Sequence, residues 1–195
     1  MNRIRSFKRI LIVILGSSIM GIGIAIALST SFGADPLAWV WEGISTTFHI
    51  SLLQSNLLIA LLMLIPPLIF DRSQLGIGTI IQPIVVGIFN EQCLKILPNN
   101  EHNIVILLLG LVILGIGVGI YTSADFGKCS YDACIFLISK KTKISVGLLR
   151  SAGDMILCVL GLFLNKQLLV GPIIAIITIG SVMNHTLKRI NMNVT

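Results

Sequence analysis

The stretch GADPLAWVWEGISTTFH, residues 33–49, decides the predicted fold. It follows a long apolar run, opens at a glycine, and is too short and too polar to cross a bilayer as a helix. A counterpart, GKCSYDACIFLISKKTK, occupies residues 127–143, and 127 − 33 = 94 residues separate the two opening glycines. Interrupted hydrophobic segments at matching places in two halves of a chain are typical of transporter binding sites. We therefore predict two broken or re-entrant helices beside a central site.

The 195-residue chain has the composition of an integral membrane protein. Hydrophobic residues make up 55% of it and charged residues 11%, and the mean hydropathy is +0.97. A soluble domain carries about 25% charged residues. Uncharged runs at 10–32, 52–70 and 167–187 are near or above the roughly 20 residues that cross about 30 Å of hydrocarbon. The first run exceeds the roughly 7–15 residues of a signal-peptide core, so we expect it to be retained as a span.

The net charge of +6 comes from basic residues that flank the apolar runs. They cluster before the first run, within residues 140–143, and at residues 188–189 after the last run. This placement is typical of cytoplasmic flanks, so we expect both termini in the cytoplasm and the lipid bilayer as a partner. Nucleic-acid binding is not expected, because no basic face interleaved with aromatic residues exists. The oligomeric state is left open.

Signatures of an enzyme, a metal site or a cofactor are absent from the sequence. The four cysteines form no C-x-x-C motif and no His/Cys ligand spacing, so neither disulfides nor a metal are expected. No H-E-x-x-H motif, Ser/His/Asp set or pair of catalytic carboxylates is visible. We expect a protein without enzymatic activity and without a cofactor.

A gapless shift of 94 residues aligns the two halves of the chain. It superposes residues that chance alignment of apolar sequence rarely matches, namely Gly16/Gly110, Gly21/Gly115, Gly23/Gly117, Gly33/Gly127, Ser45/Ser139, Ser51/Ser145 and Asn90/Asn184. We predict a duplication, with a first membrane repeat at 1–94, a linker at 95–103, a second repeat at 104–190 and a tail at 191–195. The expected spans are 8–32, 52–70 and 75–93 in the first repeat, and 104–126, 144–165 and 168–187 in the second.

The predicted fold class is an all-α polytopic membrane protein with about six transmembrane helices and two short broken or re-entrant helices. Residues 36–48 would extend only about 20 Å as a helix, which is too short for a crossing. Three crossings in each half make the second half inverted, and we prefer this 3+3 inverted repeat. A 4+4 parallel repeat, in which the short helices also cross, is the alternative.

Asp35 and Pro36 are typical of a helix start, with Asp35 as N-cap and Pro36 at the first helical position. Gly33 suits the turn that ends the preceding span. Asp35 is either a simple cap or part of a half-helix terminus that faces a cavity and receives a polar group. Asp132 stands just inside the second half-helix. Trp39 is predicted either to anchor its helix at the membrane interface or to line the substrate site.

Arg150 and Asp154 are the strongest ionisable candidates. They lie four residues apart on one helix face, and Asp154 would sit about 15 Å deep, near the bilayer midplane. A charge there costs at least about 2.5–3.5 kcal/mol and usually faces a partner or a cavity. The two residues form either a mutual salt bridge that locks the bundle or a proton- or ion-coupled site in which Asp154 titrates. Asn56 aligns with Arg150 under the shift of 94, so such a site is asymmetric.

Small residues mark two further places. The span at 75–93 opens with residues that permit close backbone approach or leave carbonyls free to coordinate an ion: Gly76, Gly78, Thr79 and Gln82. The glycines in the first span of each half, among them Gly115 and Gly117, predict close helix packing.

Several short motifs carry a resemblance to a known family. They are GADP at 33–36, LGIGT at 75–79, the G-x-Y-x-S-A-x-x-G run at 119–127 that contains Tyr121, and Asp132 together with the pair Arg150/Asp154. On these motifs the chain resembles the YczE/YyaS/YitT family of bacterial integral membrane proteins, and most of all its YczE-like branch, over nearly its whole length. The resemblance implies a multi-pass protein of the bacterial plasma membrane. The place before the last span reads LVGPI at 169–173 instead of a second GIGT, which argues against a symmetric pair of glycine turns.

The leading functional hypothesis is a secondary transporter or exporter of a small solute, with proton or ion coupling as one form of it. The alternative is a non-transporting membrane accessory or sensor that binds a partner protein or a lipid. The candidate substrate-binding residues are Asp35, Trp39, Asn56, Thr79, Gln82, Tyr121, Asp132, Arg150 and Asp154. The residues with a predicted structural role are Gly33, Pro36, Gly76, Gly78, Gly115, Gly117 and Gly127.

Overall fold

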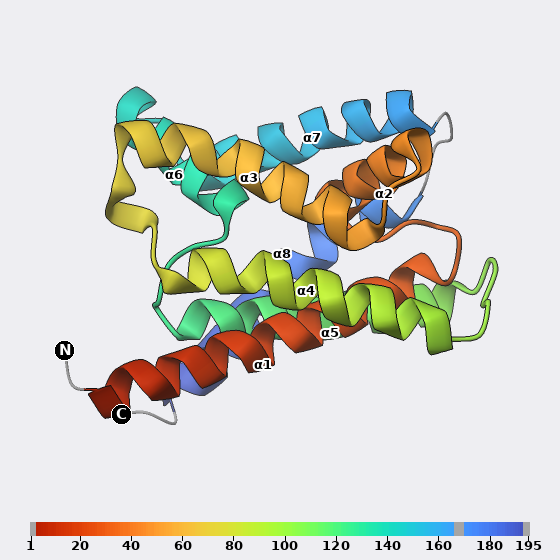
Figure 1. Cartoon of the computed structure of the whole chain (residues 1–195), viewed down its shortest axis with the longest axis horizontal. Helices are drawn as coiled ribbons and strands as arrows, with labels where there is room; N and C mark the ends of the chain where they lie inside the picture. Colours follow the sequence, from red (N-terminus) through yellow and green to blue (C-terminus); the bar gives the residue numbers. More distant parts are fainter. Residues whose placement is uncertain (1–2, 166–169, 193–195) are drawn as a thin grey trace.

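The computed structural model in Figure 1 describes residues 3–165 and 170–192. Its helices are α1 (Arg3–Leu28), α2 (Pro36–Phe48), α3 (Leu52–Phe70), η1 (Arg72–Gln74), α4 (Ile77–Ile96), α5 (Ile104–Ser123), α6 (Ser130–Thr142), α7 (Val146–Asn165) and α8 (Val170–Met192). Every regular element within the described ranges is helical, and six of the helices are long and apolar enough to cross a membrane. Those six are α1, α3, α4, α5, α7 and α8. The predicted all-α fold with six spans is confirmed.

The first span of each half ends earlier than predicted. α1 stops at Leu28 rather than at residue 32, although no charge interrupts the sequence there. The hydroxyls of Ser29 and Thr30 donate to the carbonyls of Ile26 and Ala27, at 2.8 and 2.6 Å, and the chain then leaves the helix through Ser31, whose φ is +59°. A hydropathy profile does not detect such a change in backbone conformation. In the second half, α5 stops at Ser123 instead of residue 126. α4 continues through Ile96 into the predicted linker, and the predicted turn at 166–167 lies outside the described residues.

Both ends of the described chain lie at one end of the helix bundle, which we call the terminal face (Figure 1). There the Arg9 guanidinium of α1 donates to the Asp125 carbonyl just after α5 at 3.2 Å, and Lys140 of α6 pairs with Asp71 after α3 at 2.6 Å. At the opposite face, the Asn100 amide between α4 and α5 donates to the Ser29 carbonyl after α1 at 2.9 Å. The six spans therefore alternate in direction.

The two short helices do not cross the bundle. α1 ends at the opposite face, and α3 begins there, where the amide of Leu53 donates to Glu91 near the end of α4. α2, with 13 residues, therefore enters from the opposite face and returns to it. α6, also with 13 residues, does the same at the terminal face, where Lys141 lies over the Phe70 ring, 3.7 Å from its centroid. The predicted pair of broken helices is present.

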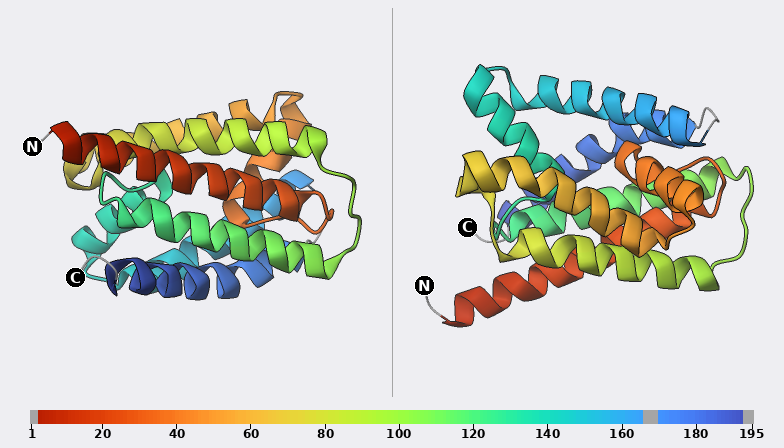
Figure 2. Two further views of the ribbon diagram at one scale, coloured as in Figure 1. Left: turned by 90° about the horizontal axis from the view of Figure 1, so that it is seen from below. Right: turned by 45° about the horizontal axis from the view of Figure 1, so that its top comes forward.

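Glycines bring α1 and α5 into backbone contact, and these helices lie side by side (Figure 2). A Cβ added to Gly16 would lie 2.5 Å from the backbone nitrogen of Tyr121, and one added to Gly117 would lie 2.6 Å from that of Met20. Gly115 faces α8 in the same way, because its Cβ would lie 2.8 Å from the Cβ of Val182. Side chains at these positions would force the helices apart.

The first helical turns of α4 and α8 make similar backbone contacts with the other half of the chain. The amide of Gly78 donates to the Phe126 carbonyl at 2.9 Å, and the amide of Gly171 donates to the Phe32 carbonyl at 2.9 Å. Gly127 beside the first of these turns has φ +109°, a conformation that favours glycine, and its Cβ would lie 2.6 Å from the Gly76 nitrogen. The LVGPI sequence thus supplies a glycine contact where we expected none.

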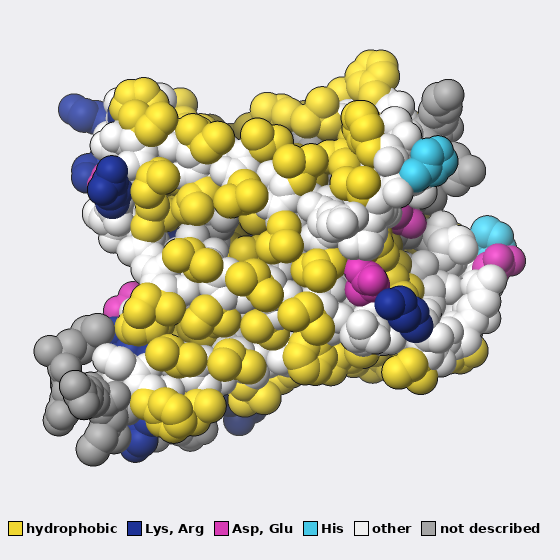
Figure 3. Space-filling view, in the orientation of Figure 1, with side chains coloured by type: hydrophobic (Ala, Val, Ile, Leu, Met, Phe, Trp, Pro, Cys, Tyr) yellow, Lys and Arg dark blue, Asp and Glu magenta, His cyan; other side chains and the backbone are white. Residues whose placement is uncertain are grey.

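The outer surface of the bundle fits a lipid environment. Figure 3 shows hydrophobic side chains over the middle of the face formed by α3 and α4, with charged side chains gathered at its two ends. Large apolar side chains on these helices are exposed, for example Leu61 at 61% and Ile80 at 60%. In hydrocarbon such exposure carries no penalty, because lipid tails are as apolar as the side chains.

Candidate functional site

A cavity of about 200 Å³ lies between the two halves of the chain. Side chains from α1 to α8 line it, including the starts of both short helices. Seven of the nine predicted binding residues are among them: Asp35, Asn56, Gln82, Tyr121, Asp132, Arg150 and Asp154. The structure therefore brings together polar groups that the sequence places up to 154 − 35 = 119 residues apart.

Trp39 and Thr79 do not line this cavity. Trp39 is 1% exposed and packs on α7, where a Cβ added to Gly161 would lie 2.6 Å from the indole ring. Trp41 lines the cavity instead and is 3% exposed, so neither tryptophan anchors the chain at the membrane interface. Residues two apart on a helix point in very different directions, and the sequence did not indicate which indole faces inward. The Thr79 hydroxyl accepts the Gly76 amide at 3.1 Å and caps α4.

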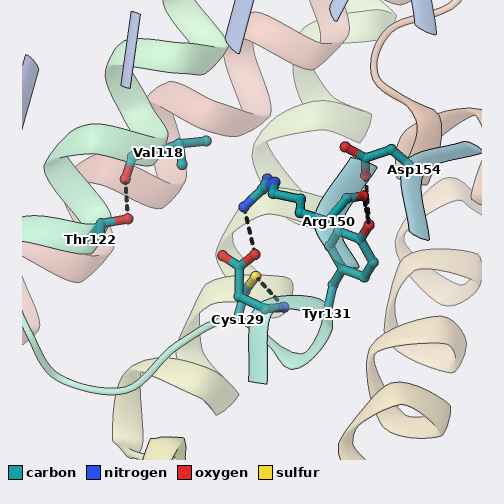
Figure 4. Close-up of polar contacts among 7 residues, drawn as sticks. Val118, Thr122, Cys129, Tyr131, Arg150 and Asp154 are labelled. Carbon is teal, nitrogen blue, oxygen red and sulfur yellow. Dashed lines mark hydrogen bonds and ion pairs between the residues drawn. The ribbon is translucent and has the colours of Figure 1, made fainter. Parts of the chain in front are cut away.

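Arg150 pairs with Asp132 rather than with Asp154. Its guanidinium lies 2.6 Å from the Asp132 carboxylate, which joins α7 to α6. Asp154 instead accepts the Tyr131 hydroxyl at 2.7 Å (Figure 4). The Arg150–Asp154 salt bridge, one of the two alternatives that the sequence left open, is absent from the described contacts, because α6 places Asp132 within reach of the guanidinium. Tyr131 is not among the predicted binding residues, although its polar side chain stands next to Asp132 at the start of the second half-helix.

A small residue on α7 makes room for this arrangement. A Cβ added to Gly153 would lie 2.6 Å from the Tyr131 hydroxyl oxygen. The same hydroxyl lies 3.2 Å from the Arg150 carbonyl, and the Arg150 guanidinium lies 5.8 Å from the centre of the Tyr131 ring. Tyr131 therefore connects both charged side chains of α7 to the start of α6.

Asp35 adopts the backbone geometry of an N-cap but does not cap α2 with its side chain. Its φ and ψ are −91° and 167°, Pro36 follows at the first helical position, and no side-chain hydrogen bond closes the helix start. One carboxylate oxygen, Oδ1, is buried without a hydrogen-bond partner among the described residues. Asp35 is therefore the N-cap residue, as predicted, and its carboxylate also lies on the cavity wall.

Two hydrogen bonds to backbone carbonyls connect α3 to its neighbours. Pro67 has no N–H for the Met63 carbonyl four residues earlier, and the Cys134 thiol of α6 donates to that carbonyl at 2.7 Å. The Asn56 amide of α3 donates to the Pro83 carbonyl of α4 at 2.6 Å. Asn56 thus reaches the cavity from a fixed position. Among residues 3–165 and 170–192, no three His, Cys, Asp or Glu side chains lie close enough together to hold a metal ion.

Comparison with known proteins places the chain among membrane proteins of bacteria. An uncharacterized protein of Haemophilus influenzae is 26% identical over 189 residues, which cover 94% of this chain and 85% of the relative. The uncharacterized membrane protein YczE of Bacillus subtilis is 24% identical over 178 residues, covering 89% and 83%. The uncharacterized protein YyaS of the same organism is 20% identical over 182 residues, covering 90% of each chain. No solved structure matches the chain.

These relatives agree with the resemblance drawn from the GADP, LGIGT and Gly119 motifs. The model of one family of unknown function, DUF6198, matches residues 7–188, which is most of the chain. The chain therefore belongs to family DUF6198, with YczE and YyaS among its relatives.

Proposed function

We propose that the protein is a secondary transporter of a small solute, which binds in the cavity between α2, α6 and α7. The observation that carries the proposal is the set of ionisable side chains that line this cavity: Asp35, Asp132, Arg150 and Asp154. An ionisable group at membrane depth costs at least about 2.5–3.5 kcal/mol, and such groups usually mark substrate or ion pathways. Both re-entrant helices begin at this cavity, as the half-helices of transporters do.

The proposal includes an inverted repeat. Under the shift of 94, Gly16 corresponds to Gly110 and Gly23 to Gly117. Added Cβ atoms on Gly16 and Gly117 would each approach the other glycine's carbonyl, and those on Gly23 and Gly110 would do likewise. This reciprocal, antiparallel contact between α1 and α5 fits a two-fold axis in the membrane plane. The helix bounds agree, since 36–48 shifted by 94 gives 130–142, the bounds of α6.

The packing of the short helices suggests how the cavity changes its access. α2 packs on α7, and α6 packs on α3, so each short helix rests on the other half of the chain. α1 and α5 form the central pair around which the halves can rock. In this mechanism the solute stays at the midplane while the cavity opens alternately to the two faces.

The terminal face is the cytoplasmic one in this proposal. Lys95 is the single Lys or Arg at the opposite face in the described part of the chain, while the terminal face carries the basic ends of α1, α6 and α8. In a variant without native cysteines, we expect Asn99→Cys to react with an impermeant maleimide added to intact bacterial cells. Ser73→Cys is expected to react only after permeabilisation, because it lies between α3 and α4 at the terminal face. The reverse pattern would place both termini outside.

Flux measurements test the transport proposal. The purified protein in liposomes is given a panel of radiolabelled amines, amino acids, sugars and carboxylates. We expect uptake of at least one class, and we expect Asp154→Asn to lower its initial rate at least tenfold, because Asp154 lacks a paired cation. Asp71→Asn, a matched change outside the cavity, is expected to leave the rate unchanged. Flux of no solute, or an Asp154→Asn variant that is fully active, would count against transport.

A non-transporting accessory protein is the second candidate, and the outer side of α7 favours it. Large apolar side chains are exposed there, with Met155 at 67% and Phe163 at 76%, and a partner protein could cover them instead of lipid. A partner protein that co-purifies in fixed stoichiometry, and is lost on polar substitution of these two residues but not of Asp154, would favour this role over transport.

A further inference from the structure

We propose that the cavity binds a lipophilic organic cation in competition with protons, with Asp35 as the main counter-charge and with access from the bilayer between α7 and α8. The inference deepens the proposed transport function and rests on the same cavity. It names the class of ligand, and its experiment measures binding rather than flux.

The first argument is the charge of the cavity. Three carboxylates and one guanidinium line it, and Arg150 is already paired with Asp132 at 2.6 Å. Asp154 has only the neutral Tyr131 hydroxyl as a described side-chain partner, and the Oδ1 atom of Asp35 is buried with no described partner. Unpaired charges are strongly disfavoured in a low-dielectric environment. Asp35 and Asp154 must therefore each hold a proton or face a mobile cation.

The second argument is the chemistry of the walls. Trp41, Tyr121 and Tyr131 line the cavity with aromatic rings, and aliphatic side chains such as Met20 and Ile59 supply much of the rest. Aromatic rings beside carboxylates are suited to ammonium ligands, whose charge is spread over methyl or methylene groups. A bare metal cation would need a shell of oxygen ligands instead. The buried Nε1 of Trp41 also lacks a hydrogen-bond partner among the described residues, so it can donate to a ligand oxygen.

The third argument is the gap between α7 and α8. These helices barely touch each other, whereas α3 and α4, at the matching places of the first half, pack closely. Gly147 on α7 and Gly180 on α8 both line the cavity, and a Cβ added to either would have no neighbour within 4 Å. Ser151 and Ile176 line the cavity and are classed as exposed rather than buried. The opening lies within two spanning helices, so an apolar tail can remain in the lipid while the cationic group reaches Asp35.

Proton competition depends on every titratable group around Asp35. From α7 these groups are Arg150, Asp154 and Cys158. From α6 and the segment before it they are Cys129, Tyr131 and Asp132. α5 contributes Tyr121, while α3 and α4 offer the neutral amides of Asn56 and Gln82 and α8 offers no titratable side chain. Acid pH places protons on the free carboxylates, so binding of the cation is expected to weaken as the pH falls.

Direct binding to the full-length protein in phosphatidylcholine nanodiscs tests the inference. The probes are radiolabelled benzyltrimethylammonium and, as a matched anion, phenylmethanesulfonate. We expect the cation to bind at pH 8 at least tenfold more tightly than at pH 5, and the sulfonate not to bind. Asp35→Asn is expected to weaken cation binding at least tenfold and to flatten its pH dependence, while Asp71→Asn leaves both unchanged. Thermal unfolding of each variant verifies that it is folded.

A second variant tests the opening without touching a charge. Gly180→Phe fills space in which no neighbour lies, so the protein should fold normally while association of the cation slows at least fivefold. Equal or tighter binding of the sulfonate, or unchanged cation binding in Asp35→Asn, would overturn the inference. The results of these binding experiments can be distinguished from the results of the flux experiments that test transport. Cation binding without flux of any solute would defeat the transport proposal alone, and flux of an anion would defeat this inference alone.

Discussion

Replacing Gly16 by leucine is expected to leave little folded protein. The new Cβ would lie 2.5 Å from the Tyr121 nitrogen and 2.9 Å from the Gly117 carbonyl oxygen, and both are backbone atoms that no side-chain rotation can move. Overpacking in a core costs about 1–3 kcal/mol when side chains can adjust, so we expect a loss above about 3 kcal/mol here. Thermal unfolding in detergent, with size-exclusion chromatography of the membrane extract, measures the effect.

The matched control is Gly147→Leu on α7. It makes the same change in a spanning helix, at a place where a Cβ would have no neighbour within 4 Å. We expect this variant to unfold within a few degrees of the wild type. If Gly16→Leu and Gly147→Leu melt alike, the close α1–α5 contact does not hold the two halves together.

Replacing Arg150 by glutamine is expected to destabilise the protein and to abolish transport. The change leaves the Asp132 carboxylate without its cation, at a site where this side chain is 22% exposed. Removing one partner of a fully buried pair costs about 3–5 kcal/mol. Because the Arg150 side chain is 37% exposed, we expect about 2–3 kcal/mol, at or below the lower end of that range. Thermal unfolding and the liposome flux assay report the two losses.

The double variant Arg150→Gln with Asp132→Asn distinguishes the electrostatic contribution of this ion pair to stability from its packing contribution. Neutralising both partners removes the stranded carboxylate, so most of the lost stability should return. Transport should remain at least tenfold reduced, since the charge pattern of the cavity is still changed. A double variant that unfolds as readily as Arg150→Gln alone would mean that the pair contributes by packing rather than by charge.

Hydropathy and the shift of 94 residues were sufficient to predict the architecture. The six spans and both short helices follow from long apolar runs and from two interruptions at matching places. These signals are local or repeat at a fixed spacing, so a single chain reveals them. Helix ends were harder to predict, because α1 ends inside an apolar run, at a turn in which Ser31 has a positive φ.

The sequence was sufficient to predict which acidic residues line the cavity, but not which side chains pair with one another. Asp35 and Asp132 stood out at the starts of the two short helices and Asp154 as an acid in an apolar span, and all three line one cavity. The partner of Arg150 could not be deduced, because its spacing to Asp154 also suits a salt bridge on one helix. Only the packing of α6 against α7 determines that the Arg150 guanidinium pairs with Asp132. The choice between Trp39 and Trp41 depended in the same way on which face of α2 meets α7.

The reliance of α2 on α7 has a consequence for biosynthesis. Trp39 is covered by the α7 surface around Gly161, which the ribosome adds 161 − 39 = 122 residues later. When α2 enters the membrane, the α7 surface that covers this indole has not yet been made. The packing of α2 can therefore be completed only after α7 has been synthesised, and a chain truncated before α7 would lack the surface that covers this indole.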